Sequence, residues 1–239
     1  MRTALILAPA LLLAACHVSV EDGGHGHVSK AFPVGGFDRI ALGGPYDAVV
    51  TVGGTASVRA EGDKTAIDRL EIKVENGQLR IATSASGGWS WGFSGRHRRA
   101  TVYVTVPALT AASIEGSGDM RIDKVAGRAF EATIGGSGDM QIGVIQVEEA
   151  KLSVSGSGDL TASGRTGKAT INVAGSGDVA ASGFEAATAT VSIVGSGDVA
   201  ARVTQSADVA VMGSGDVTVT GNAKCTIRKM GSGDVHCGG

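Results

Sequence analysis

The sequence of 239 residues has few aromatic side chains, little net charge and only three cysteines. Aromatic residues make up 4% of the chain, which argues against a globular core built on bulky rings and favours a thin core with many tight corners. A formal net charge of −2 gives no support to nucleic-acid binding, because that function needs a concentrated basic face. The chain also has no Cys-x-x-Cys and no His-x-x-x-His pair, so the common spacings of redox and metal centres are missing.

No apolar run in the N-terminal region is long enough to span a membrane. Residues 1–15 combine one arginine with a short apolar stretch, which is typical of a secretory signal peptide. The stretch ends in Leu13-Ala14-Ala15-Cys16 and resembles the bacterial lipoprotein box. That resemblance implies cleavage before Cys16, lipidation of its thiol and a stable membrane anchor. The alternative is an ordinary signal peptide that happens to be followed by a cysteine.

The lipoprotein reading also has consequences for location and for the next segment. A residue other than aspartate after the lipidated cysteine, here His17, favours the outer membrane in many Gram-negative bacteria. We therefore expect a lipid-anchored cell-envelope protein, facing the periplasm or the cell surface. Residues 16–36 are rich in glycine and lack a sustained apolar period, so they are predicted to form a flexible tether.

The tetrapeptide Gly-Ser-Gly-Asp occurs seven times between residues 116 and 234. Successive copies are separated by 18 to 20 residues. Apolar residues recur at every second position on both sides of each copy, and small polar residues stand between them. A period of two is the pattern of a β-strand with one buried face. Each unit therefore reads as a strand, a Gly-Ser-Gly-Asp corner, a second strand and a looser second corner.

Units of this length are too short for helix pairs and fit one coil of a β-solenoid, in which equivalent strands stack at about 4.8 Å. The predicted fold is all-β, a single elongated solenoid domain over residues 37–239. A meander of hairpins is the alternative. A meander would tolerate varied turns, whereas stacking requires each corner to fit on the one before it.

The seven recurrent aspartates have two interpretations. The first is turn chemistry, in which the glycines adopt unusual φ angles and the serine and aspartate side chains cap backbone N–H groups. The second is a row of like charges that would favour bound cations such as calcium. We favour turn chemistry, expect no cofactor, and keep the calcium ladder as the weaker alternative for these residues: Asp119, Asp139, Asp159, Asp178, Asp198, Asp216 and Asp234.

The last unit reads as an end cap. Arg228-Lys229 interrupts an apolar column that six earlier units keep, and a terminal coil needs a polar outer face. Cys225 and Cys237 both fall in inward columns of this unit, so a disulfide is expected in an oxidising compartment. A metal or redox pair is the alternative, although the spacing does not match one.

The N-terminal half predicts strands over residues 46–52, 57–61 and 101–106, a helical turn over 65–70, and a hairpin through Asn76-Gly77. Phe37-Asp38-Arg39-Ile40, Asn76-Gly77-Gln78-Leu79, the strand Val102–Val106 leading into Pro107-Ala108-Leu109, and the repeated tetrapeptide together resemble the bacterial auto-transporter adhesin, head GIN domain family. The resemblance covers roughly residues 37–239. It implies a β-solenoid of secreted or lipid-anchored envelope proteins and an adhesin-like role.

One segment, residues 86–99, breaks the pattern and contains both tryptophans of the chain. Exposed aromatic and arginine side chains commonly contact sugars, lipid headgroups or proteins. The alternative is a long loop whose rings fold back over the end of the coil. The candidate binding residues are Trp89, Trp91, Phe93, Arg96, Arg98 and Arg99.

The repeated tetrapeptide itself carries no catalytic signature. Its Gly-Ser-Gly completes neither Gly-x-Ser-x-Gly nor Gly-x-Gly-x-x-Gly. We therefore predict a non-enzymatic, adhesin-like binding or display scaffold, whose partners are a membrane through the anchor and a glycan or envelope protein. The alternatives are a carbohydrate-active enzyme on surface polysaccharide and a purely structural spacer.

Overall fold

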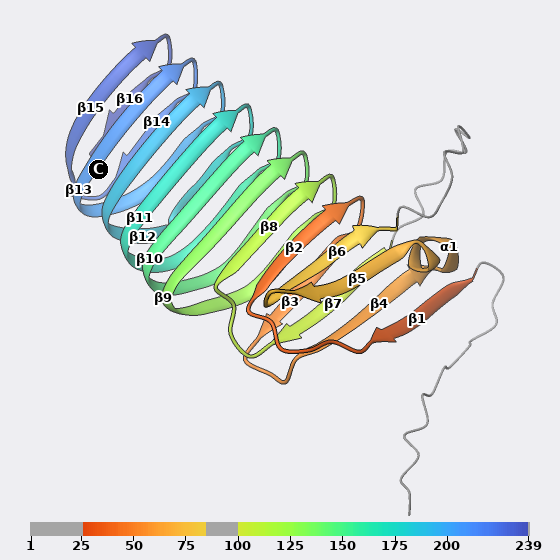
Figure 1. Cartoon of the computed structure of the whole chain (residues 1–239). Helices are drawn as coiled ribbons and strands as arrows, with labels where there is room; N and C mark the ends of the chain where they lie inside the picture. Colours follow the sequence, from red (N-terminus) through yellow and green to blue (C-terminus); the bar gives the residue numbers. More distant parts are fainter. Residues whose placement is uncertain (1–25, 85–99, 239) are drawn as a thin grey trace, which may run out of the picture.

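The protein is a β-solenoid, a single coil of strands stacked along one axis (Figure 1). The computed structural model describes residues 26–84 and 100–238. The strands of this part form one 16-stranded sheet that winds through the stack, and the only described helix is α1 (Lys64–Asp68), which has five residues. The predicted all-β solenoid is confirmed. No helix in the described ranges has the length and apolar character needed to cross a membrane.

Five long strands form the middle of the stack, and each runs from one Gly-Ser-Gly-Asp corner to the next. Neighbours are parallel and their glycine corners are in register, so that Gly156 lies opposite Gly136 on one side and opposite Gly175 on the other. The ribbons bend around the second corner without a break in Figure 1. A hairpin meander would make the neighbours antiparallel, so that alternative is wrong. The strands are β9 (Met120–Gly136), β10 (Met140–Gly156), β11 (Leu160–Gly175), β12 (Val179–Gly195) and β13 (Val199–Gly213).

The last coil is divided into three strands. Strands β14 (Val217–Thr220) and β15 (Lys224–Gly231) both pair with β13, and β16 (Val235–Cys237) pairs with β14. This coil forms the C-terminal end of the rod in Figure 1. Because nothing in the described chain follows it, its inward-facing columns are only partly covered.

The N-terminal end combines parallel coil strands with antiparallel ones. β2 (Arg39–Gly44) pairs in parallel with β6 (Gln78–Thr83) and β8 (Ala111–Gly116), and β3 (Asp47–Val52) pairs in parallel with β7 (Ala100–Val106) and β9. Antiparallel strands then extend the stack beyond these: β4 (Ser57–Asp63) on β7, β1 (His27–Phe32) on β4, and β5 (Leu70–Glu75) on β6.

The predicted hairpin and helical turn are present. The turn between β5 and β6 has positive φ at Asn76 (51°) and Gly77 (76°), which matches the two-residue turn favoured by Asn-Gly. Asp63 caps α1 by accepting a hydrogen bond from the backbone N–H of Thr65. These local features follow from sequence signals within a few residues of each other.

The predicted tether is wrong for residues 27–32, which form β1. Val28 and Phe32 lie on the same face of this strand, are partly buried and pack against the core. β4 would otherwise present an unpaired edge, and β1 covers it with six paired residues. The expectation failed because an edge strand gains its order from a partner about 30 residues further along the chain, and no local pattern reports that partner.

The core consists of stacked aliphatic columns, as the period of two predicts. The columns directly after each aspartate and two residues before each first glycine are buried in every coil up to β13. Bulky rings are rare inside, and Phe130 and Phe184 are the largest fully buried side chains. The narrow interior leaves room for few aromatic residues. The two columns contain Met120, Met140, Leu160, Val179 and Val199, and Ile114, Ile134, Val154, Val173, Ile193 and Val211.

Close stacking explains why both glycines of each corner are repeated. A Cβ atom added to Gly158 would overlap the carbonyl oxygen of Gly138, and one added to Gly156 would overlap that of Gly136. Gly156 also has φ 133°, in the region that favours glycine. The glycine at the third position of each corner does not have a positive φ, and neither do Gly116 and Gly136, so the expectation of unusual φ angles at both glycines is wrong for these residues. Their requirement is steric and comes from the neighbouring coil.

The stack contains an eighth corner that the sequence does not reveal. Gly44 lies opposite Gly116 and Ala48 lies opposite Met120, so Gly44-Pro45-Tyr46-Asp47 occupies the place of a Gly-Ser-Gly-Asp corner. Tyr46 stands where the other corners have their third glycine, and its ring is buried beside Thr83. No corner precedes this one in the stack, so a side chain fits there.

Candidate functional site

The most regular surface feature is a row of aspartates along the glycine corners, here called the aspartate ladder. Each carboxylate except that of the last aspartate accepts a hydrogen bond from the backbone N–H of the next aspartate in the stack, at 2.7–3.1 Å. The aspartate carbonyl oxygens in turn accept hydrogen bonds from the N–H groups that follow the preceding corner, such as Met140 to Asp159 at 2.8 Å. The ladder contains Asp47, Asp119, Asp139, Asp159, Asp178, Asp198, Asp216 and Asp234.

This geometry supports the turn-chemistry interpretation and refines it. The capped N–H group belongs to the neighbouring coil rather than to the same turn. One oxygen of each carboxylate is therefore committed to a backbone donor, which offsets the repulsion between stacked like charges. Among residues 26–84 and 100–238, no group of three histidine, cysteine or acidic residues is arranged to hold a metal ion. The calcium ladder gains no geometric support from these residues.

The candidate binding residues Trp89, Trp91, Phe93, Arg96, Arg98 and Arg99 lie outside the described residues, as does Cys16. The structure describes the two strands that flank the segment of the candidate binding residues. β6 ends at Thr83 and β7 begins at Ala100, and both strands belong to the N-terminal end of the solenoid. The segment therefore joins the stack at the end that also contains β1.

An aromatic and cationic surface lies on β4 and β7, next to this connection, and sequence reasoning missed it. Tyr103 is 37% exposed, and the Arg59 guanidinium lies 4.9 Å from the centroid of its ring. Arg59 also forms an ion pair with Glu61. The alternation along residues 101–106 already indicated that Tyr103 faces outward, but the partner on β4 becomes evident only from the antiparallel register, in which Arg59 lies opposite Tyr103.

The segment between β6 and β7 also contains Gly88-Trp89-Ser90-Trp91-Gly92, a match to Gly-x-Ser-x-Gly. A catalytic serine in that motif stands at a turn between a strand and a helix. Here the flanking described elements are both strands, and the motif itself lies outside the described residues. The structural context that would support a hydrolase is therefore not found in the described flanks.

A concave surface of about 620 Å³ lies at the second corner of β9, β10 and β11. Leu109, Phe130 and Ala150 contribute apolar lining, and charged side chains surround it. Lys151 forms an ion pair with Glu131 across neighbouring coils, at 2.7 Å. This pair joins two neighbouring coils at the rim of the surface.

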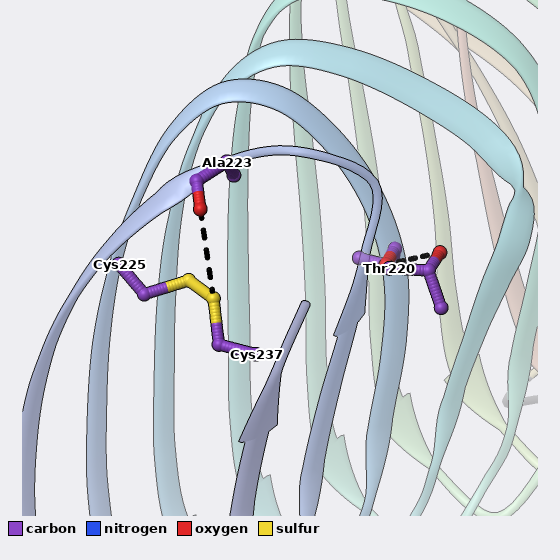
Figure 2. The surroundings of a disulfide bond; sticks show 5 residues. Thr220, Ala223, Cys225 and Cys237 are labelled. Carbon is purple, nitrogen blue, oxygen red and sulfur yellow. Dashed lines mark hydrogen bonds between the residues drawn. A yellow bond between two sulfur atoms is a disulfide. The ribbon is translucent and has the colours of Figure 1, made fainter. Parts of the chain in front are cut away.

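The two predicted cysteines form a disulfide in the last coil. Cys225 on β15 and Cys237 on β16 are joined across the open end, and their Cα atoms are 6.5 Å apart (Figure 2). The Cys237 sulfur also lies 3.9 Å from the carbonyl oxygen of Ala223. The bond links the two strands that have no further coil beyond them in the described part of the chain, which is where this end of the stack would fray.

Parallel coils, glycine corners in van der Waals contact and a continuous aspartate ladder define the class of protein: a single-chain β-solenoid with a structural acidic edge. The chain belongs to the family described as "Putative auto-transporter adhesin, head GIN domain", which matches residues 36–223. The resemblance inferred from the sequence motifs is confirmed. No curated protein matches this chain.

Several solved structures share the fold at low sequence identity. A "putative adhesin" from Bacteroides fragilis is 21% identical, with a TM-score of 0.79, over 88% of this chain and 96% of that one. A "putative lipid binding protein" from Parabacteroides distasonis is 23% identical, with a TM-score of 0.69, over 88% and 96%. A "putative adhesin" from Parabacteroides merdae is 15% identical, with a TM-score of 0.65, over 88% and 95%. At these identities the likeness establishes the shared solenoid fold.

Proposed function

We propose that this chain is a lipid-anchored cell-envelope solenoid that acts as a non-catalytic, adhesin-like binding or display scaffold. The observation that favours this function is that the aspartate ladder has a structural role. Its carboxylates, the most conspicuous acidic groups of the rod, accept backbone hydrogen bonds between coils and so serve the scaffold. Membership of an adhesin family supports the same role.

The membrane partner in this proposal is reached through Cys16. Leu13-Ala14-Ala15-Cys16 supports lipidation, and residues 17–26 would connect the acylated cysteine to β1. Replacement of Cys16 by serine should release the protein from the membrane fraction and abolish incorporation of radiolabelled palmitate. Retention of label in that variant would contradict the anchor, whatever the solenoid binds.

The contact surface in this proposal is the segment that contains Trp89, Trp91 and Phe93, with a glycan or envelope protein as its partner. The Arg59–Tyr103 pair would extend this surface, because Tyr103 is on β7, the strand that follows the segment, and Arg59 is on the neighbouring β4. A triple alanine variant of the three aromatic residues should lose binding on a glycan array while its far-UV circular dichroism stays unchanged. Tyr103→Ala should weaken binding in part.

The same glycan assay distinguishes the proposal from a carbohydrate-active enzyme. Binding without released oligosaccharide supports the scaffold. Release of product by the wild type that is lost in Ser90→Ala would instead identify the Gly-x-Ser-x-Gly segment as catalytic and overturn the non-enzymatic function.

A further inference from the structure

The two ends of the rod each present an unpaired strand edge in the described chain. At the C-terminal end β15 pairs only with β13, and β16 only with β14. At the N-terminal end β1 pairs only with β4. Open edges of this kind allow further strands to add, so a repetitive solenoid could stack on a second copy of itself.

A lysine lies in an inward column at the C-terminal edge. Lys229 is opposite Val211, which is 2% exposed, and continues the column that Ile193 and Val173 fill in earlier coils. Its ammonium lies 3.4 Å from Oδ1 of Asp234. The side chain therefore begins in an apolar column and turns toward the aspartate ladder.

Asp234 is the last member of the ladder, and it differs from the others in its partner. The carboxylates from Asp47 to Asp216 each accept a backbone N–H from the coil that follows. Within residues 100–238 no further coil follows Asp234, and the Lys229 ammonium contacts its carboxylate instead. Lys229 thus has two effects on an added coil. Its side chain begins in an interior column, and its ammonium contacts the Asp234 carboxylate, which would otherwise accept a backbone N–H of that coil.

The N-terminal edge also has a lysine on the inward face of its last strand. Lys30 on β1 is opposite Ala60, which is fully buried, so its side chain starts on the inward face of the sheet. Its ammonium lies over the Phe32 ring, 4.9 Å from the ring centroid. Both strands that carry these lysines fall outside the 36–223 region shared with the family.

We propose that Lys30 and Lys229 keep this solenoid monomeric by blocking end-to-end association with a second copy of the chain. A copy stacked on the C-terminal edge would displace the Lys229 ammonium from Asp234, and one stacked on the N-terminal edge would displace the Lys30 ammonium from the Phe32 ring. An ammonium group enclosed in the apolar interior without such a partner is unfavourable. Without the lysine, stacking at the C-terminal edge would be favourable. It would cover Ile227, which is 45% exposed, and the partly buried Val235.

The test compares valine substitutions at two lysines of the same coil, in the full chain carrying Cys16→Ser so that no acyl chain contributes. Lys229→Val restores the residue type of the preceding coil and should produce a species of twice the monomer mass by sedimentation velocity. Lys224→Val is the matched control, because Lys224 is opposite the exposed Ser206 on the outward face. The control should stay monomeric, and Lys229→Arg should also stay monomeric.

The double variant Lys30→Val with Lys229→Val opens both edges and should form species larger than dimers. Far-UV circular dichroism establishes that each variant is folded, and Lys229→Ser gives a second variant that removes the charge without adding an apolar group. A folded Lys229→Val chain that remains monomeric at its solubility limit would overturn the proposal. Equal association of the Lys224→Val control would also overturn it, because the effect would then follow from net charge alone.

Discussion

The carboxylate of Asp159 accepts a hydrogen bond from the backbone N–H of Asp178 at 2.9 Å, while the carbonyl oxygen of Asp178 accepts one from the N–H of Leu160 at 2.8 Å. The two corners are thus joined in both directions. This relationship recurs from coil to coil and explains how a row of like charges can be part of a stable edge. Each carboxylate up to Asp216 accepts a hydrogen bond from a backbone N–H, and this bond offsets the repulsion from the neighbouring carboxylates.

The ladder hydrogen bond predicts different costs for two substitutions at Asp159. Asp159→Ala leaves the Asp178 N–H without its acceptor and should destabilise the protein by about 1–3 kcal/mol. Asp159→Asn keeps a side-chain oxygen acceptor and should cost less. Urea unfolding followed by circular dichroism measures both, and amide exchange at Asp178 should be faster only in the alanine variant. Equal stabilities of the two variants would show that the bond contributes little.

Alanine in place of the glycine at the third position of a corner should strongly destabilise the protein. In Gly158→Ala the new methyl group overlaps the carbonyl oxygen of Gly138, so the stacked backbones must separate. We expect a loss of about 2–4 kcal/mol, at the upper end of overpacking effects. Gly135→Ala is the matched control, since the nearest atom to its added methyl, the carbonyl oxygen of Ile114, is 3.6 Å away. Thermal unfolding of both variants should separate them clearly; a small effect at Gly158 would contradict the close stacking.

Removal of the disulfide should loosen the last coil and leave the middle of the rod intact. The bond closes a loop between residues 12 apart in sequence, for which the constraint on the unfolded chain amounts to about 3 kcal/mol. In Cys225→Ala with Cys237→Ala, hydrogen exchange should accelerate in β15 and β16 but not in β10 or β11. Cys16→Ser serves as the control for cysteine loss. Uniform acceleration along the whole rod would indicate that the bond stabilises the fold globally.

The contacts of β1 predict that its two apolar side chains hold it on the stack. Val28→Asp with Phe32→Asp should detach the strand and make residues 26–36 sensitive to limited proteolysis, because the introduced carboxylates cannot pack against the core. Ser29→Asp is the control on the outward face of the same strand. The coils from β9 to β13 should resist cleavage in both variants; protection of residues 26–36 in the double variant would contradict the packing.

The solenoid was predictable because its signals are local and repeated. Alternating apolar residues specify strands, Gly-Ser-Gly-Asp specifies corners, and the step of 18 to 20 residues indicates one corner in each coil. The Asn76-Gly77 turn and the pairing of Cys225 with Cys237 also depend on residues close together in the chain. None of these inferences required knowledge of a distant partner.

The features that the sequence did not reveal all depend on distant partners. Gly44-Pro45-Tyr46-Asp47 is the first corner of the stack although 72 residues separate Asp47 from the aspartate that it caps. β1 is a strand because β4 would otherwise have an open edge, and Arg59 meets Tyr103 only through the antiparallel register.

The amino-acid sequence by itself determined the coil, because strand period and corner chemistry are properties of short segments. The tertiary structure alone decided which N–H group each aspartate caps, why a tyrosine replaces glycine in the first corner, and where the terminal lysines lie. The physical reason is that these properties arise between coils: a corner needs glycine only when another corner is stacked against it, and an end exists only where stacking stops.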